Sequence, residues 1–130
     1  MVKVSAQALH PTQPFLGGTE IVRVDYALGK LAIYVRGLAR GTGVAVEFVD
    51  VNGFRMLDER DMSNFWPTCS TENGWLFEIF SGGWISQEDE RTGGAFKACN
   101  HRAREFLITG ADDCMTVLCS DTPKVTPHAL

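Results

Sequence analysis

Residues 75–80 read Trp-Leu-Phe-Glu-Ile-Phe, and glycine residues stand on both sides of this stretch. Successive side chains of a β-strand point to opposite faces, so this segment would present apolar side chains on nearly the whole of both faces. A strand of that kind lies in the middle of a sheet or beneath a covering helix, because both of its faces must leave water. The stretch therefore predicts a central strand in a fold that is built on a sheet.

Short apolar stretches recur on both sides of this strand, at the spacing that is typical of antiparallel β proteins. Before it, apolar alternation predicts strands over residues 20–28, 31–38 and 44–51. After it, two more strands are expected to form a last hairpin, at 104–109 and 114–120. This pattern favours an antiparallel sheet over a helical bundle or a βαβ fold.

The dipeptide Asn52-Gly53 is the strongest local turn signal in the chain. Both residue types tolerate the positive φ that a type I′ turn requires, and apolar residues flank them on each side. We therefore expect a tight hairpin that joins residues 49–51 to residues 54–56.

The pattern becomes helical after this hairpin. Residues 58–67 predict a short helix, because Asp58 can cap its first turn, acidic residues follow, and Pro67 would end it. The apolar side chains with helical spacing, which would pack on the sheet, are Met62, Phe65 and Trp66. Residues 84–91 fit either a loop or a second short helix.

Together these elements predict an α+β, β-dominated domain. It would contain an antiparallel sheet of six to eight short strands, in a meander or sandwich-like arrangement, with one or two short helices packed on it. The globular domain would span residues 19–123. Residues 1–18 lack periodicity and are expected to form an N-terminal arm, while residues 124–130 would be a C-terminal tail after Pro123.

Composition and charge narrow the possible partners. The 130 residues fit one domain, with 45% apolar and 22% charged residues and a net charge of −4 at pH 7. An acidic chain is a poor polyphosphate binder, so no nucleic-acid partner is expected. No run approaches the ~18 consecutive apolar residues of a membrane helix, and the first residues lack the layout of a secretory leader. We expect a cytoplasmic protein without membrane contact.

Metal and catalytic signatures are weak. Cys99, His101, Cys114 and Cys119 offer four zinc-capable ligands, but their spacing lacks the two-residue knuckle of zinc modules. Cys114 and Cys119 would also point to opposite faces of one strand. The four cysteines, which include Cys69, are expected to be free thiols. No phosphate-binding loop, dinucleotide fingerprint or nucleophile motif occurs, so no metal, cofactor or catalytic residue is assigned.

Candidate binding residues follow the central strand. Trp84 stands between glycines and an acidic segment, and its side chain is expected to be accessible. The acidic segment can serve as a binding site or simply as a solvated loop, and the basic residues before the last hairpin can hold an anion or protect an edge strand. The candidates are Trp84, Glu88, Asp89, His101, Arg102 and Arg104.

Three segments carry a resemblance to known proteins: the run from Gly74 to Trp84, residues 105–110 and residues 114–123. Together they look like small bacterial proteins of unknown function, some of which are similar in size and layout to immunity proteins that neutralise toxins. The resemblance implies a bacterial cytoplasmic domain. It assigns no activity and no functional residue.

These observations favour a non-enzymatic protein-interaction domain, of which an immunity-like protein and a self-associating protein are two forms. An edge strand at 20–28 or 114–120 would allow a homodimer to form by strand addition. The alternative is a small-ligand-binding protein or an enzyme with a cleft near Trp84, Glu88 and Arg102.

Overall fold

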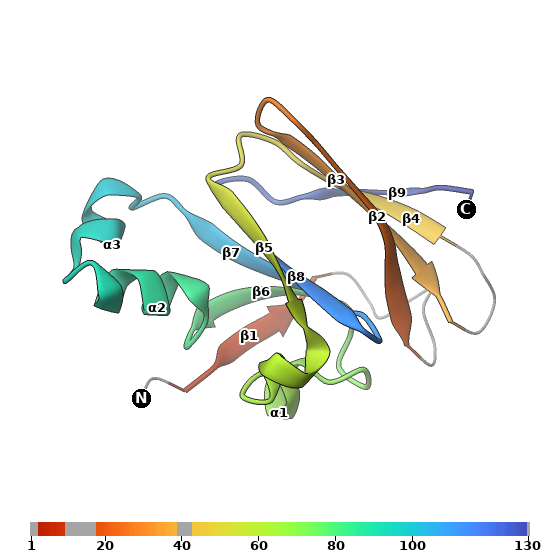
Figure 1. The fold of residues 1–130 in the computed structure, drawn as a ribbon, viewed down its shortest axis with the longest axis horizontal. Coiled ribbons are helices and arrows are strands. Elements are labelled where there is room, and N and C mark those ends of the chain that lie inside the picture. Colours follow the sequence, from red (N-terminus) through yellow and green to blue (C-terminus); the bar gives the residue numbers. More distant parts are fainter. Residues whose placement is uncertain (1–2, 10–17, 39–42, 130) are drawn as a thin grey trace.

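A computed structural model describes residues 3–9, 18–38 and 43–129. It contains two antiparallel sheets that enclose a common core (Figure 1). The five-stranded sheet has, in order, the strands β1 (Ser5–Ala8), β6 (Leu76–Ser81), β7 (Arg104–Ile108), β8 (Asp113–Cys119) and β5 (Gly53–Asp58). The four-stranded sheet has, in order, β2 (Thr19–Ala27), β3 (Lys30–Gly37), β4 (Gly43–Phe48) and β9 (Lys124–Pro127). The β-dominated antiparallel fold is confirmed, in its sandwich form.

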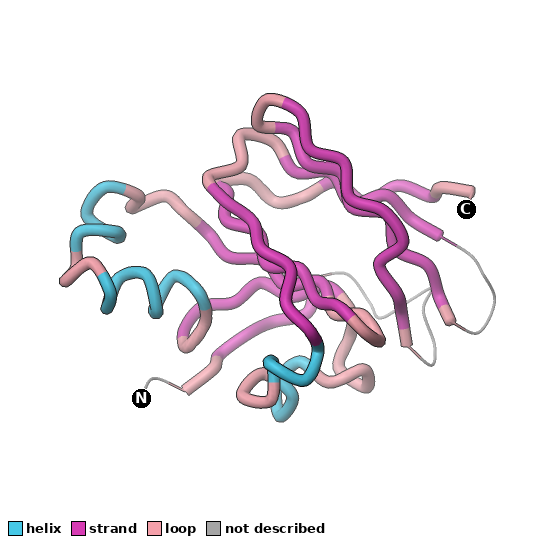
Figure 2. The backbone as a smooth tube through the Cα atoms, viewed as in Figure 1, coloured by secondary structure: helices cyan, strands magenta, loops and turns pink. Residues whose placement is uncertain are grey.

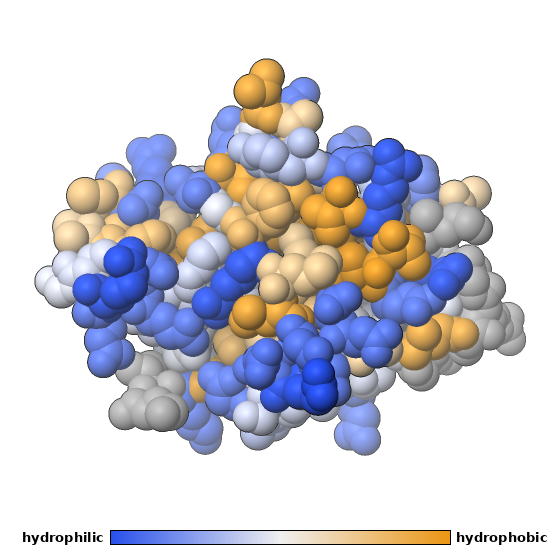
Figure 3. Space-filling model, in the orientation of Figure 1, coloured by the Kyte–Doolittle hydropathy of each residue, from blue (hydrophilic) through white to orange (hydrophobic). Residues whose placement is uncertain are grey.

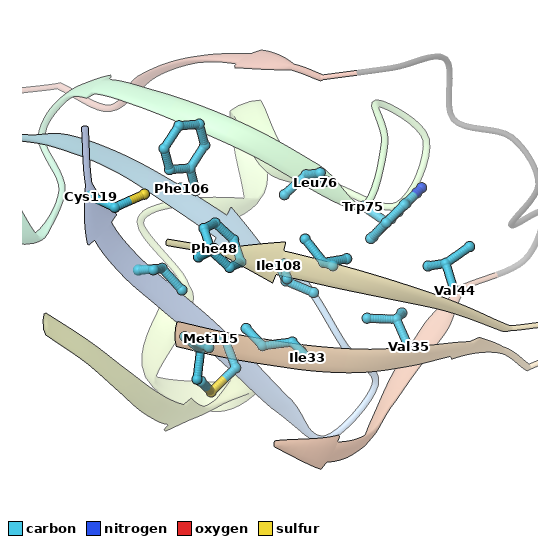
Figure 4. Packing of buried hydrophobic residues seen from close by; sticks show 13 residues of the cluster. Ile33, Val35, Val44, Phe48, Trp75, Leu76, Phe106, Ile108, Met115 and Cys119 are labelled. Carbon is cyan, nitrogen blue, oxygen red and sulfur yellow. The ribbon is translucent and has the colours of Figure 1, made fainter. Parts of the chain in front are cut away.

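The main core lies between the two sheets (Figure 4). Strand β3 contributes Leu31, Ile33 and Val35, each at most 1% exposed, because alternate residues of a strand share one face. Phe48 of β4 meets Phe106 of β7 across the interface, with ring centroids 5.8 Å apart. Burial of these side chains is the main source of stability for the sandwich.

A second apolar cluster covers the opposite face of the five-stranded sheet. It is formed by the 3₁₀-helix η1 (Glu59–Met62) and by α1 (Trp66–Cys69). Met62 and Phe65 are buried there against Leu107 of β7, as their spacing predicts. The Asp58 side chain accepts a hydrogen bond from the Arg60 N–H at 2.9 Å, so the predicted cap is also confirmed.

Pro67 does not end a single helix over residues 58–67. It lies in the first turn of α1, where the missing N–H of proline has no partner to lose. The expectation for the central strand is confirmed, because β6 lies between β1 and β7 and its outer face is covered.

The predicted hairpin at Asn52-Gly53 is wrong. Strand β4 belongs to one sheet and β5 to the other, so these residues carry the chain between the sheets. The Val51 N–H donates to the Gly29 carbonyl at 3.1 Å and the Asn52 N–H to the Leu118 carbonyl at 2.7 Å. Pairing of β5 with β8, and of β4 with β3 and β9, replaces the local hairpin.

Both ends of the domain extend further than the sequence indicates. Strand β1 pairs with β6, and β9 pairs with β4, so parts of 1–18 and 124–130 belong to the sheets. The ambiguous segment is a helix, α2 (Trp84–Arg91), and a further short helix that was not predicted follows it, α3 (Ala95–Cys99). The helical segments lie away from the four-stranded sheet (Figure 2). In the described ranges no helix has the length and apolarity needed to span a membrane.

Candidate functional site

The structure separates the six predicted binding residues into three places. Trp84, Glu88 and Asp89 lie on α2. His101 and Arg102 are exposed in the turn after α3, and Arg104 begins β7. They do not line one cleft.

Trp84 stands at the first turn of α2, above a carboxylate that sequence reasoning missed. Glu105 of β7 is 1% exposed, and its two oxygens accept hydrogen bonds from the N–H groups of Trp84 and Ile85, at 2.9 and 2.8 Å. These N–H groups have no partner inside the helix, and the negative charge also favours the positive end of the helix dipole. Burial raises the pKa of Glu105, although these hydrogen bonds oppose the shift. Glu105 therefore anchors α2 to the sheet.

Arg55 of β5 covers the Trp84 side chain. Its guanidinium carbon lies 4.7 Å from the ring centroid, within the range of a cation–π contact. The indole N–H donates to Glu88 at 3.3 Å, and Glu88 in turn pairs with Arg91 at 2.7 Å. Burial lowers the pKa of Arg55, and its buried Nε atom has no hydrogen-bond partner among the residues that the structure describes. Trp84 is thus half-buried, and Glu88 is committed to contacts within α2.

Of the remaining predicted residues, Asp89 and Arg104 form hydrogen bonds within the domain, whereas His101 and Arg102 are exposed. Asp89 accepts a hydrogen bond from the Lys97 N–H at 3.0 Å, which links α2 to α3. Arg104 donates two hydrogen bonds, both of 2.8 Å, to the carboxylate of Glu78 on β6. A hollow of about 400 Å³ lies between the helices α2 and α3 and the strands β6 and β7. His101 and Arg104 line part of it. Trp84, Glu88, Asp89 and Arg102 do not line this hollow.

The cysteines are placed for packing rather than chemistry. All four are free, and all but Cys99 are buried; Cys114 and Cys119 lie on opposite faces of β8, as predicted. Burial raises the pKa of Cys69 to about 12 and that of Cys119 to about 11, which disfavours the nucleophilic thiolate. Within the described part of the chain, no three His, Cys, Asp or Glu residues gather closely enough to hold a metal ion.

A different surface has the features of a binding site, and none of its residues was among the predicted binding residues. Strands β2 and β5 are edges of their sheets. On both strands, some side chains on the face that is turned toward the core are exposed to solvent. We call this surface the apolar strip, and its members are Val24, Tyr26, Phe54 and Met56. The ring centroids of Tyr26 and Phe54 lie 5.3 Å apart, so these two side chains contact each other across β2 and β5. Figure 3 shows apolar side chains gathered where β2 and β5 face the viewer.

Alternation explains why the strip is apolar. Val24 and Tyr26 pair with Ile33 and Leu31, whose side chains enter the core, so all four lie on the inner face of the four-stranded sheet. In the same way, Phe54 and Met56 of β5 pair with Val117 and Met115 of β8. The signal for the strip was therefore present in the alternation, but its exposure depends on which strands become edges. Of the two strands that the sequence left open as possible edges, the 20–28 strand lies at an edge as β2, whereas the 114–120 strand is interior as β8.

Comparison with protein-family models, curated proteins and solved structures found no match to this chain.

Proposed function

We propose that this chain is a non-enzymatic protein-interaction domain that binds its partner through the apolar strip. The observation that carries the proposal is that β2 and β5, which among the described residues have no neighbouring strand on one side, bring large exposed apolar side chains together. Tyr26 is 52% exposed, Met56 45% and Phe54 37%. Contiguous exposed apolar surface is typical of protein interfaces, and an open strand edge adds unpaired backbone groups that a second strand can satisfy.

The hairpin tip beside the strip supports the same proposal. Leu28 is 99% exposed and has a φ of 47°, in the left-handed region that is unfavourable for a residue with a side chain. Its side chain contributes no burial to the fold that would offset this backbone cost. The two-residue turn that Leu28 forms with Gly29 requires this backbone, so the support for the proposal is the exposure of a large apolar side chain beside the strip.

The charged groups near α2 support a structural role more than a catalytic one. Glu105 caps the helix, Glu88 pairs with Arg91, and Arg104 pairs with Glu78. The alternative function, a small-ligand site or an enzyme near Trp84, would have to use the hollow beside β6 and β7, which most of the predicted residues do not reach. Immunity-like binding of a toxin and self-association, in a bacterial cytoplasm, are the two forms of the proposed function.

Serine substitutions in the strip test the proposal. We expect the Tyr26→Ser and Phe54→Ser variants to bind any protein partner at least about tenfold more weakly, since central aromatic residues dominate interface energies. The measurement is affinity purification of the tagged chain with a second, differently tagged copy present, followed by quantitative mass spectrometry of polypeptides retained at fixed stoichiometry.

Phe80 supplies the matched control, because it is an aromatic residue on β6 that is 59% exposed and lies outside the strip. Phe80→Ser should retain partners as the wild type does, and urea unfolding should show that all variants are folded. Two results contradict the proposal: retained polypeptides that are unaffected by both strip variants, or no polypeptide retained by the wild type. Loss on Phe80→Ser alone would favour the hollow, which Phe80 helps to line.

A further inference from the structure

Strand β2 offers the most suitable edge for pairing with another chain. In the described ranges the edge strands are β1, β5, β2 and β9. Strand β1 has four residues, and β9 ends in Pro127, which lacks an N–H and protects an edge. Strand β2 has nine residues and is the longest of the four.

The hairpin geometry shows which backbone groups of β2 are free. Leu28 and Gly29 both have positive φ and form a two-residue turn that places Ala27 opposite Lys30. In an antiparallel ladder of this type the pair that flanks the turn is hydrogen-bonded, and the pairs then alternate. Ala27 and Asp25 therefore direct their N–H and C=O groups to β3, whereas Tyr26 and Val24 direct theirs to the free edge.

The side chains of this segment are complementary to a second copy of themselves. The register of β2 is regular from Arg23 to Ala27, because its shift lies before Arg23. If a two-fold axis passes between the Val24 residues of two copies, each Val24 lies opposite its counterpart, and Arg23 lies opposite Asp25 of the other copy. Apolar side chains then meet on one face and opposite charges on the other.

Arg23 and Asp25 already form an ion pair within one chain. They lie 3.0 Å apart on the same face of β2, and their side chains are 68% and 44% exposed. Pairing about Val24 would place the Arg23–Asp25 ion pairs of the two copies side by side, and the two pairs would run in opposite directions because the strands are antiparallel. Two copies would therefore assemble a square of four alternating charges.

Other two-fold registers lack this match. An axis at Arg23 places the two arginines opposite each other, and an axis at Asp25 does the same for the two aspartates. Like charges directly opposite each other destabilise a sheet, whereas opposite charges stabilise it. On β5 the two charged residues, Arg55 and Asp58, are three apart and so lie on opposite faces, which prevents the same arrangement.

We propose that a second copy of this chain docks on β2 by antiparallel β2–β2 pairing about Val24, which joins two four-stranded sheets into one. This inference rests on the proposed function and names its partner. Each copy contributes unpaired backbone groups at Val24 and the Arg23–Asp25 ion pair, which has no net charge. Each copy also contributes one half of an apolar surface that continues through Tyr26 to Phe54. The net charge of −4 on each chain does not oppose this contact locally, because Arg23 and Asp25 sum to zero.

Charge exchange at Arg23 and Asp25 tests the inference. Arg23→Asp and Asp25→Arg each place four like charges at the contact, and each should raise the dimer dissociation constant at least about tenfold in low salt. The double variant R23D/D25R restores alternation and should recover the wild-type constant within about threefold. An equimolar mixture of the two single variants should form a heterodimer, since one contributes acidic and the other basic groups. Sedimentation velocity measures all of these constants.

The same variants separate this inference from the proposed function. A wild-type chain that stays monomeric up to millimolar concentration, or a double variant that remains as weak as the single variants, overturns the second-copy inference. If the strip variants still lose a different polypeptide in that case, the proposed function stands with another partner. Thermal unfolding of each variant serves as the folding control, and little change is expected because both residues are exposed.

Discussion

Replacing Gly83 with alanine is expected to destabilise the domain by about 3 kcal/mol, a large share of the stability of a typical domain. A Cβ atom at this position would overlap an Oε atom of Glu105 and would lie 2.8 Å from its Cδ atom. Glu105 is 1% exposed, and two backbone N–H groups of α2 hold its carboxylate, so it can move away from the added methyl group only by giving up these hydrogen bonds. The substitution would displace it from the N–H groups of Trp84 and Ile85 and leave a buried charge without these partners.

Gly93→Ala is the matched control for this prediction. Gly93 has a φ of 63°, and no atom of the described residues lies within 4 Å of the point that a Cβ atom would occupy, so only the backbone cost of about 1 kcal/mol applies. Urea unfolding of both variants should therefore rank Gly83→Ala as the more damaging change, although only Gly93 has a left-handed backbone. The reverse order would contradict the anchoring role assigned to Glu105.

Phe106→Ala is expected to cost about 3–5 kcal/mol, since it removes a fully buried ring from the centre of the sandwich. Phe106 has no exposed surface and packs on Phe48 of the opposite sheet. The guanidinium of Arg104 also lies over its ring, 5.0 Å from the centroid. The free energy of unfolding in urea measures the loss.

Phe80→Ala on the neighbouring strand is the control, because the Phe80 side chain is 59% exposed. We expect it to change the free energy of unfolding by about 0.5 kcal/mol or less. If Phe106→Ala leaves too little folded protein to measure, Phe106→Leu supplies a smaller loss at the same site. Equal effects at positions 80 and 106 would contradict the packing of the two sheets.

Most strands could be predicted because their signal is local. The alternation in β3 determines which side chains enter the core, and the apolar faces of β6 require cover on both sides. The order of the strands was not predictable in the same way. Asn52-Gly53 has every local property of a hairpin turn, but the pairing of β5 with β8 depends on residues more than fifty positions away.

The contacts around α2 could not be predicted from the sequence for a related reason. Trp84 and Glu88 are close in sequence and could be selected together, but Arg55 and Glu105 come from two strands of the sheet. Nothing in the local sequence shows that Glu105, in the mostly apolar strand β7, faces the N-terminus of α2. The apolar strip was likewise unpredictable as a surface, because exposure of Phe54 and Tyr26 depends on which strands become edges.

Hydrogen exchange at the β2 edge tests the central claim most directly. By NMR, the amides of Asp25 and Ala27 should exchange slowly at every concentration, because they are bonded to β3. The amides of Val24 and Tyr26 should exchange quickly in dilute solution and become protected as the chain associates with its partner. Val24 and Tyr26 amides that still exchange quickly when the chain is fully associated would contradict the account, because the partner would then be bound elsewhere.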